Sequence, residues 1–212
     1  MAISLKKGQG VSLRKSEFDL SSVTIGLGWD VTTEKKGFFK ALFGKDDADY
    51  DLDAIAFLLD GNGKVRLGSD AQGNVALKDS DVVFYNNMRH QGGAIWLTGD
   101  NRTGAGDGDD EQIIVRLDDI ETRHERIVFI VAIYQGRQKG QNFGKVKNAF
   151  IRAVDACGQE ICRYDISGTA AFAQYCSITF AEVARKDGGW EFRALGEPHE
   201  TDRFTDLLSS YI

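Results

Sequence analysis

Short apolar runs separated by glycine-rich turns dominate this sequence and restrict the folds that it can adopt. The runs are rich in β-branched and aromatic residues, which favour strands. The chain has 24 glycines and 1 proline, and glycine accepts the positive φ angles that tight turns require. Many short strands with regular turns predict a mainly β fold, a two-sheet β-sandwich. The runs predicted to be strands are residues 23–31, 52–59, 81–85, 94–98, 112–117, 126–134, 149–154, 160–166, 177–185 and 190–195.

Helical signals are confined to two segments. Residues 201–211 (TDRFTDLLSSY) begin with Thr201 as a helix cap and predict a C-terminal helix. Its apolar residues fall on one helical stripe, which consists of Phe204, Leu207, Leu208 and Tyr211. Residues 142–147 predict a short helical turn. We expect a single domain over residues 1–212, with insertions near 33–50 and 67–80, because no linker or internal repeat divides the chain.

The composition excludes several classes of protein. The net charge of −6 argues against a nucleic-acid-binding protein, which needs a basic surface to neutralise phosphates. No apolar run reaches the roughly 18 residues of a transmembrane segment, and the first residues lack the hydrophobic region of a secretory signal. Cys157, Cys162 and Cys176 include no C-x-x-C pair, which predicts buried, reduced thiols and a cytoplasmic location.

Acidic residues concentrate where predicted strands end. The glycine-rich segment GDNRTGAGDGDDE (99–111) holds five carboxylates and a single arginine. Asp30 ends one strand, Asp51 and Asp53 lie on one face at the start of another, and Asn86 follows a third. Like charges so close together repel, so a cation must compensate them or the segment must stay open to water. The five carboxylates are Asp100, Asp107, Asp109, Asp110 and Glu111.

Oxygen ligands in flexible loops favour calcium over other ions. Ca²⁺ takes about 6–8 oxygens with loose geometry, whereas Mg²⁺ demands a stricter octahedron. Zn²⁺ favours nitrogen and sulfur ligands, and His90, His124 and His199 lie in unrelated segments. The EF-hand pattern fails at both Asp60 and Asp107, so a calcium site must be assembled from separate loops. A solvated acidic surface without metal is the alternative interpretation.

Several motifs together resemble one known family. They are GLGWD (26–30), DLDAIAFLLDGNGKV (51–65), DVVFYNN (81–87), GDNRTGAGDGDDE (99–111) and AFIRAVD (149–155). From about residue 3 to residue 196, the chain resembles the TerD family of tellurium-resistance and stress-response proteins. The resemblance implies a β-sandwich whose clustered acidic loops bind Ca²⁺, as more than one ion. The ligands that it implies are Asp30, Asp51, Asp53, Asn86, Asp100, Asn101, Asp107, Asp109, Asp110 and Glu111.

The predicted function is that of a calcium-binding cytoplasmic stress-response protein of the tellurite-resistance type. We expect it to be non-enzymatic and to act through protein partners, including other tellurium-resistance proteins at the membrane. One alternative is a metal-dependent hydrolase built on Asp107, Asp109 and Asp110. The other is a calcium-dependent adaptor, peripheral to the inner face of the membrane, into which residues 38–43 (FFKALF) insert.

Overall fold

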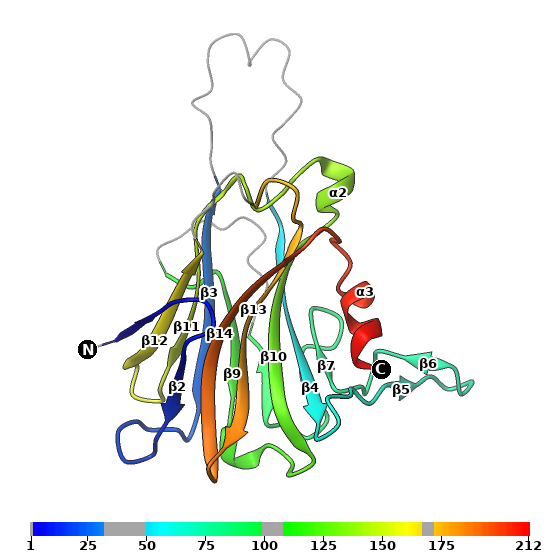
Figure 1. Cartoon of the computed structure of the whole chain (residues 1–212). Helices are drawn as coiled ribbons and strands as arrows, with labels where there is room; N and C mark the ends of the chain where they lie inside the picture. The colour runs from blue at the N-terminus through cyan, green and yellow to red at the C-terminus, as the bar shows by residue number, and fades with distance from the viewer. Residues whose placement is uncertain (1, 32–49, 99–107, 167–171) are drawn as a thin grey trace.

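The computed structural model describes residues 2–31, 50–98, 108–166 and 172–212, and within them two six-stranded sheets pack face to face (Figure 1). The first sheet has the order β1 (Ile3–Leu5), β12 (Glu160–Ile166), β11 (Val146–Val154), β3 (Val23–Val31), β9 (Glu111–Val115) and β8 (Ile95–Leu97). The second has the order β2 (Gly10–Leu13), β14 (Gly189–His199), β13 (Ser177–Lys186), β10 (His124–Ile133), β4 (Leu52–Asp60) and β7 (Val82–Val83). The predicted two-sheet β-sandwich is therefore confirmed.

The main core lies between the sheets because alternate residues of each strand point inward. In β3, Ile25 and Leu27 are almost wholly buried in this core, while Gly26 between them faces the outer surface of the first sheet. In β4 the alternation continues on both faces. Ile55 and Phe57 belong to a second apolar cluster on the outer side of the second sheet.

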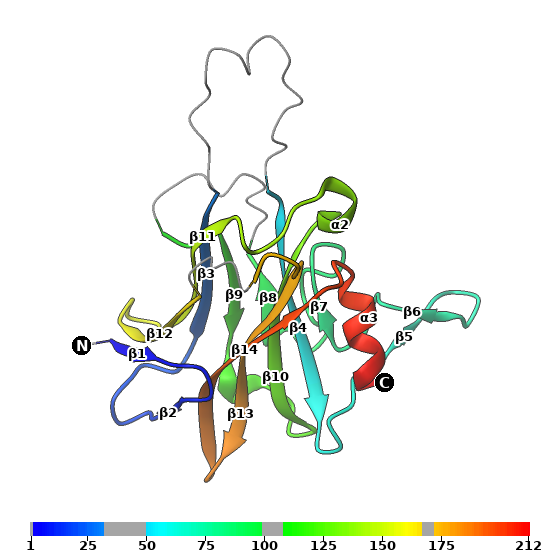
Figure 2. The same cartoon turned by 45° about the horizontal axis from the view of Figure 1, so that its top comes forward.

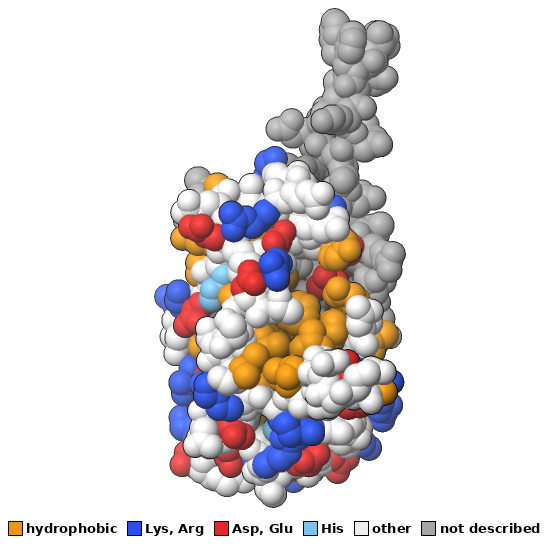
Figure 3. Space-filling view, turned by 90° about the vertical axis from the view of Figure 1, so that its right-hand side faces the viewer, with side chains coloured by type: hydrophobic (Ala, Val, Ile, Leu, Met, Phe, Trp, Pro, Cys, Tyr) orange, Lys and Arg blue, Asp and Glu red, His pale blue; other side chains and the backbone are white. Residues whose placement is uncertain are grey.

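The C-terminal helix covers this second cluster. It comprises α3 (Phe204–Leu208), continued by the 3₁₀ turn η3 (Ser209–Tyr211). Leu208 is buried, and the Tyr211 ring contacts the Phe57 ring edge-on with 5.6 Å between centroids. The predicted apolar stripe is thus confirmed, and Figure 3 shows apolar side chains gathered on the side of the molecule that carries α3.

The helix begins later than predicted. Thr201 does not cap α3 directly, because its hydroxyl accepts a hydrogen bond from the Arg203 amide at 3.1 Å and donates one to Asp206 at 2.6 Å. The predicted helical turn at residues 142–147 is wrong. The short helix α2 (Gly136–Lys139) lies earlier, and β11 already begins at Val146.

The remaining elements occupy the connections between strands. A small hairpin of β5 (Gly68–Ser69) and β6 (Val75–Ala76) lies within residues 67–80 and projects beside α3 (Figure 1). The 3₁₀ turn η1 (Leu117–Asp119) joins β9 to β10. Residues 33–49 of the other expected insertion, with the apolar segment 38–43, lie outside the described residues.

Two further findings concern the cysteines and membrane helices. All three cysteines are free, but Cys157 is exposed, which corrects the expectation that all are buried. In the described part of the chain, no helix has the length and apolar character needed to cross a bilayer.

Candidate metal centre

Three strand ends bring the predicted acidic residues to one end of the sandwich. The end of β3 and the start of β4 lie at the same end in both views (Figures 1 and 2). β9 is antiparallel to β3, with Leu27 opposite Glu111. Residues 108–110, which precede β9, therefore lie beside the last residues of β3. We call this region the acidic end.

Asp110 is tied to the backbone of β3. Its amide donates to the Leu27 carbonyl at 2.7 Å, and its Oδ2 accepts from the Trp29 amide at 2.8 Å. Burial raises the pKa of Asp110 above its ordinary value, and the negative charges of Asp30 and Asp109 raise it further. The Trp29 hydrogen bond lowers this pKa but does not offset those effects. Asp30, Asp109 and Asp110 therefore form a group of interacting carboxylates.

Asp109 packs against the outer face of β3, where its side chain is buried and pairs with a cation. Its Oδ1 accepts from Arg152 Nε at 2.8 Å, and its Oδ2 accepts from Gln112 at 3.1 Å. The hydrogen bond with Asp109 is the main reason that the pKa of Arg152 is raised. Arg152 also donates to Glu160 at 3.0 Å, so this arginine bridges two carboxylates on the outer face of the first sheet.

The two glycines of GLGWD make room for the acidic segment. A Cβ on Gly26 would lie 2.2 Å from Asp109 Oδ2, and one on Gly28 would lie 2.7 Å from the Gly108 carbonyl. Real Cβ atoms do not approach other heavy atoms so closely. Glycine is therefore required at these positions because residues 108 and 109 pack directly on the strand.

Glu111 lies between the two sheets. It is 3% exposed, and its Oε2 accepts a hydrogen bond from the Ala54 amide of β4 at 2.5 Å. This contact links β9 of the first sheet to β4 of the second at the acidic end. Glu111 thus lies between the sheets, whereas the Asp109 side chain is buried against the outer face of β3.

The predicted ligands on the second sheet lie in a different environment. Asp53 is half-buried and contributes, after burial, to raising the pKa of Tyr85. Asp51 is half-buried, and its carbonyl accepts from the Tyr134 amide at 2.7 Å. Asn86 is exposed in the turn between Phe84 and Asn87. The predicted ligands Asp100, Asn101 and Asp107 lie outside the described residues.

The structure adds a polar residue that the sequence did not reveal. Asn148 has a φ of 50° at an irregularity in the pairing of β11 with β3. Its side-chain amide donates to Asp30 Oδ2 at 2.6 Å. The irregularity turns Asn148 toward the acidic end, and strand alternation alone does not predict this contact.

A second group of potential metal ligands includes two of the three histidines, although these lie in unrelated segments of the sequence. His90 and His124 come from separate segments, but the fold places both rings beside Asp81. The three residues are buried, and their donor atoms lie within 4.8 Å of one another. Sequence separation is therefore a poor guide to the proximity of these two side chains.

Comparisons with known proteins place this geometry in context. The family model described as "TerD domain" matches residues 1–211. The chain is 58% identical to tellurium resistance protein TerX of Serratia marcescens over the full length of both chains. It is 41% identical to tellurium resistance protein TerD of the same organism, covering 93% of this chain and 91% of the relative.

A stress protein and a solved structure extend the comparison. Stress response protein SCP2 of Bacillus subtilis is 36% identical over the full length of both chains. The crystal structure of a homologue of telluride resistance protein (TerD) from Streptomyces coelicolor matches with a TM-score of 0.61 and 22% identity. That match covers 87% of this chain and 94% of the other, and it supports the fold.

Proposed function

The chain belongs to the TerD family of tellurium-resistance and stress-response proteins, and from this premise we propose that it is a calcium-binding, non-enzymatic protein. We further propose that it acts in the cytoplasm through protein partners. The observation that carries the calcium proposal is the group of interacting carboxylates Asp30, Asp109 and Asp110 at the acidic end.

The electrostatics of Asp110 support a bound cation. Burial and two neighbouring negative charges disfavour its ionised form, which is why its pKa is raised. A divalent ion beside the carboxylate reverses that effect, because the ion stabilises the charged form. A bound cation therefore stabilises this group of carboxylates more than it would stabilise separate, fully hydrated carboxylates.

The chemistry of the donors favours calcium. Asp30 and Asp110 offer carboxylate oxygens, and the Asn148 amide oxygen lies on the side chain that already contacts Asp30. Ca²⁺ accepts such oxygens with irregular geometry and flexible coordination number. Asp109 serves less directly, because Arg152 and Gln112 already occupy its oxygens.

Calcium would act on this protein by mass action. An ion that binds only the folded state stabilises it by about 2.7 kcal/mol at 100 times its Kd. By drawing the acidic end together, the ion would present an ordered surface to a partner. This role requires no chemical step.

Calcium titration tests the proposal. We expect isothermal calorimetry to show saturable Ca²⁺ binding, and Ca²⁺ to raise the melting temperature more than equal Mg²⁺ does. Asp110→Asn keeps an acceptor for the Trp29 amide but loses the charge, so its calcium affinity should fall. Asp165→Asn is the matched control, because Asp165 is paired with Arg163 on the same sheet. A melting curve unchanged by saturating calcium would eliminate the proposal.

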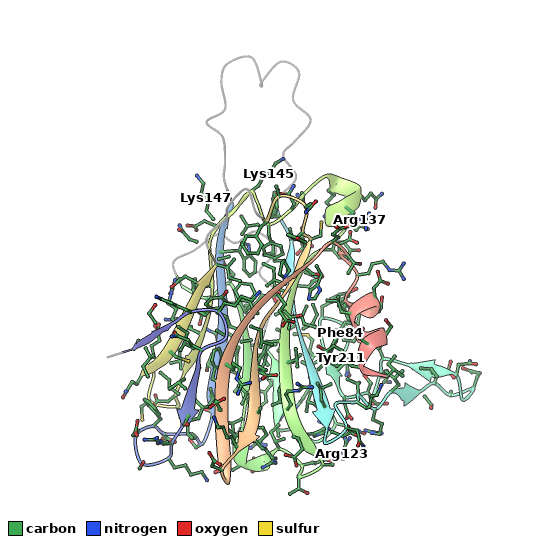
Figure 4. The ribbon with its side chains drawn as sticks, viewed as in Figure 1. Phe84, Arg123, Arg137, Lys145, Lys147 and Tyr211 are labelled. Carbon is green, nitrogen blue, oxygen red and sulfur yellow. The ribbon has the colours of Figure 1, made fainter. Side chains whose placement is uncertain are left out.

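A membrane-peripheral role is a second candidate. The exposed residues Arg137, Lys145 and Lys147 lie at the same end of the sandwich as the acidic residues (Figure 4). Cations beside a calcium site suit an anionic lipid surface, where calcium can bridge carboxylates to headgroups. Sedimentation with vesicles containing phosphatidylserine should then require calcium, and a lack of calcium-dependent pelleting would reject this candidate.

A further inference from the structure

A buried histidine–aspartate cluster lies away from the acidic end. Asp81 directly precedes β7, His124 begins β10, and His90 lies in the connection from β7 to β8. Arg123, the neighbour of His124, lies at the end of the molecule opposite Lys145 and Lys147 (Figure 4). The cluster is therefore separate from the proposed calcium site.

The distances within the cluster match those between ligands of one small ion. His90 Nε2 lies 2.9 Å from Asp81 Oδ1, and His124 Nε2 lies 3.4 Å from Asp81 Oδ2. The imidazole rings are 5.4 Å apart between centroids and nearly perpendicular. Atoms that share a tetrahedral ion at about 2.1 Å lie about 3.4 Å from one another. The cluster needs little rearrangement to meet that geometry.

His124 lacks the partners that a buried imidazole requires. It is 1% exposed, and neither of its ring nitrogens makes a hydrogen bond within the described part of the chain. Its Nε2 only approaches Asp81, and buried polar atoms without a partner are costly. A metal ion bound at Nε2 would supply the missing interaction.

Asp81 is prepared to act as an anionic ligand. Its side chain is 1% exposed, and its negative charge is paired with the Arg123 guanidinium. Arg123 donates to both carboxylate oxygens, at 2.7 and 2.8 Å. A carboxylate has about four lone-pair positions. The Arg66 amide also donates to Oδ2 at 3.2 Å, so the position that metal binding would free is the one on Oδ1 that now accepts from His90.

The donor atoms select the class of ion. Ca²⁺ takes about 6–8 oxygen ligands, whereas this cluster offers one carboxylate and two imidazoles. Neutral imidazole nitrogens instead suit Zn²⁺ and neighbouring transition metals.

Metal binding must change the tautomer of His90, as its present hydrogen bonds show. The Gly92 amide donates to His90 Nδ1 at 3.1 Å, so the proton of the neutral ring is on Nε2, which donates to Asp81. Binding at Nε2 moves that proton to Nδ1. The Gly92 amide then loses its acceptor on Nδ1, so zinc binding must also change this hydrogen bond.

We propose that Asp81, His90 and His124 form a binding site for one transition-metal ion of the Zn²⁺ class. The site goes beyond the proposed function, because it uses none of the acidic-end residues. The tests of this site use saturating calcium. A negative result for the site therefore does not count against the calcium proposal, and failure of the calcium proposal does not count against the site.

Cobalt is the spectroscopic probe. We expect the wild type to bind one Co²⁺ at this site with the intense visible absorption of tetrahedral coordination, and Zn²⁺ to displace that absorption. His90→Gln and His124→Gln should lose it. His199→Gln is the matched control, because the third histidine contacts Thr179 instead and should leave the spectrum intact. A cobalt spectrum that survives in His124→Gln, or none in the wild type, would overturn the proposal.

A measurement on the wild type decides the question even if the variants do not fold. Nitrogen-15 NMR of the imidazoles should show His90 change from the Nε2–H to the Nδ1–H tautomer on adding Zn²⁺. The Nε2 signal of His124 should shift as well, while His199 stays unchanged. Unaltered signals of His90 and His124 at saturating Zn²⁺ would rule out the site.

Discussion

Replacing Gly26 by alanine tests how the acidic segment packs on β3. The new Cβ would lie 2.2 Å from Asp109 Oδ2, so the carboxylate must leave its position. It then loses the Arg152 hydrogen bond of 2.8 Å, and a bond of this charged kind contributes about 1.5–3 kcal/mol. The reduced backbone entropy of alanine in the unfolded chain returns about 0.4–1 kcal/mol. We expect a net loss of about 1–2 kcal/mol in the free energy of unfolding, measured by urea denaturation in the absence of calcium.

A double-mutant cycle makes this prediction specific. In an Asp109→Ala background the obstructing carboxylate is gone, so Gly26→Ala should cost nothing or stabilise slightly. Gly61→Ala is the matched control, because a Cβ there meets only Glu125 Cγ at 3.8 Å. If Gly26→Ala is as stable as the wild type, or costs the same with and without Asp109, the packing argument is refuted.

Three further predictions concern charge, the C-terminal helix and backbone conformation. The pKa of Asp110 in the folded state is raised above its ordinary value of 3.8, so ionisation of this group destabilises the folded state as the pH rises above 3.8. In the absence of calcium, Asp110→Asn should therefore be more stable than the wild type at pH 7. Denaturation curves should show that this advantage is lost below pH 3.8. Leu208→Ala removes a side chain that is 3% exposed and should cost about 2–4 kcal/mol, whereas exposed Ser210→Ala should cost under about 0.5 kcal/mol; equal costs would contradict the packing of α3. Asn148 has a positive φ, so Asn148→Gly should be about 1 kcal/mol more stable than Asn148→Ala, and the reverse order would contradict the left-handed conformation.

The strand pattern made most of the fold predictable. β3 and β12 match their predicted ranges, because both strands are apolar, β-rich and bounded by polar turns. β1 and β2 were missed because they are short and partly exposed, and their pairing with β12 and β14 gives no local signal. The helical turn was misplaced because the chain enters and leaves α2 through left-handed residues, Gln135 and Gly140, that periodicity does not detect.

The sequence predicted the negative charge of the candidate site but not its contacts. Acidic residues at strand ends indicated Asp30, Asp109 and Asp110, which the structure brings together. Their partners Arg152 and Asn148 come from β11, and their contacts depend on the strand register and on an irregularity in it. Only the tertiary structure brings the two histidines beside Asp81, so their spacing in the sequence did not predict that they are close together.

The central claim is that a divalent ion compensates the carboxylates at the acidic end. A crystal structure of the protein grown in millimolar calcium tests it most directly. We predict an ion bonded to carboxylate oxygens of Asp30 and Asp110 and enclosed by protein oxygens. Two ions about 4 Å apart with an open water position would instead indicate a hydrolase. The same carboxylates exposed to solvent with no bound ion would contradict the account.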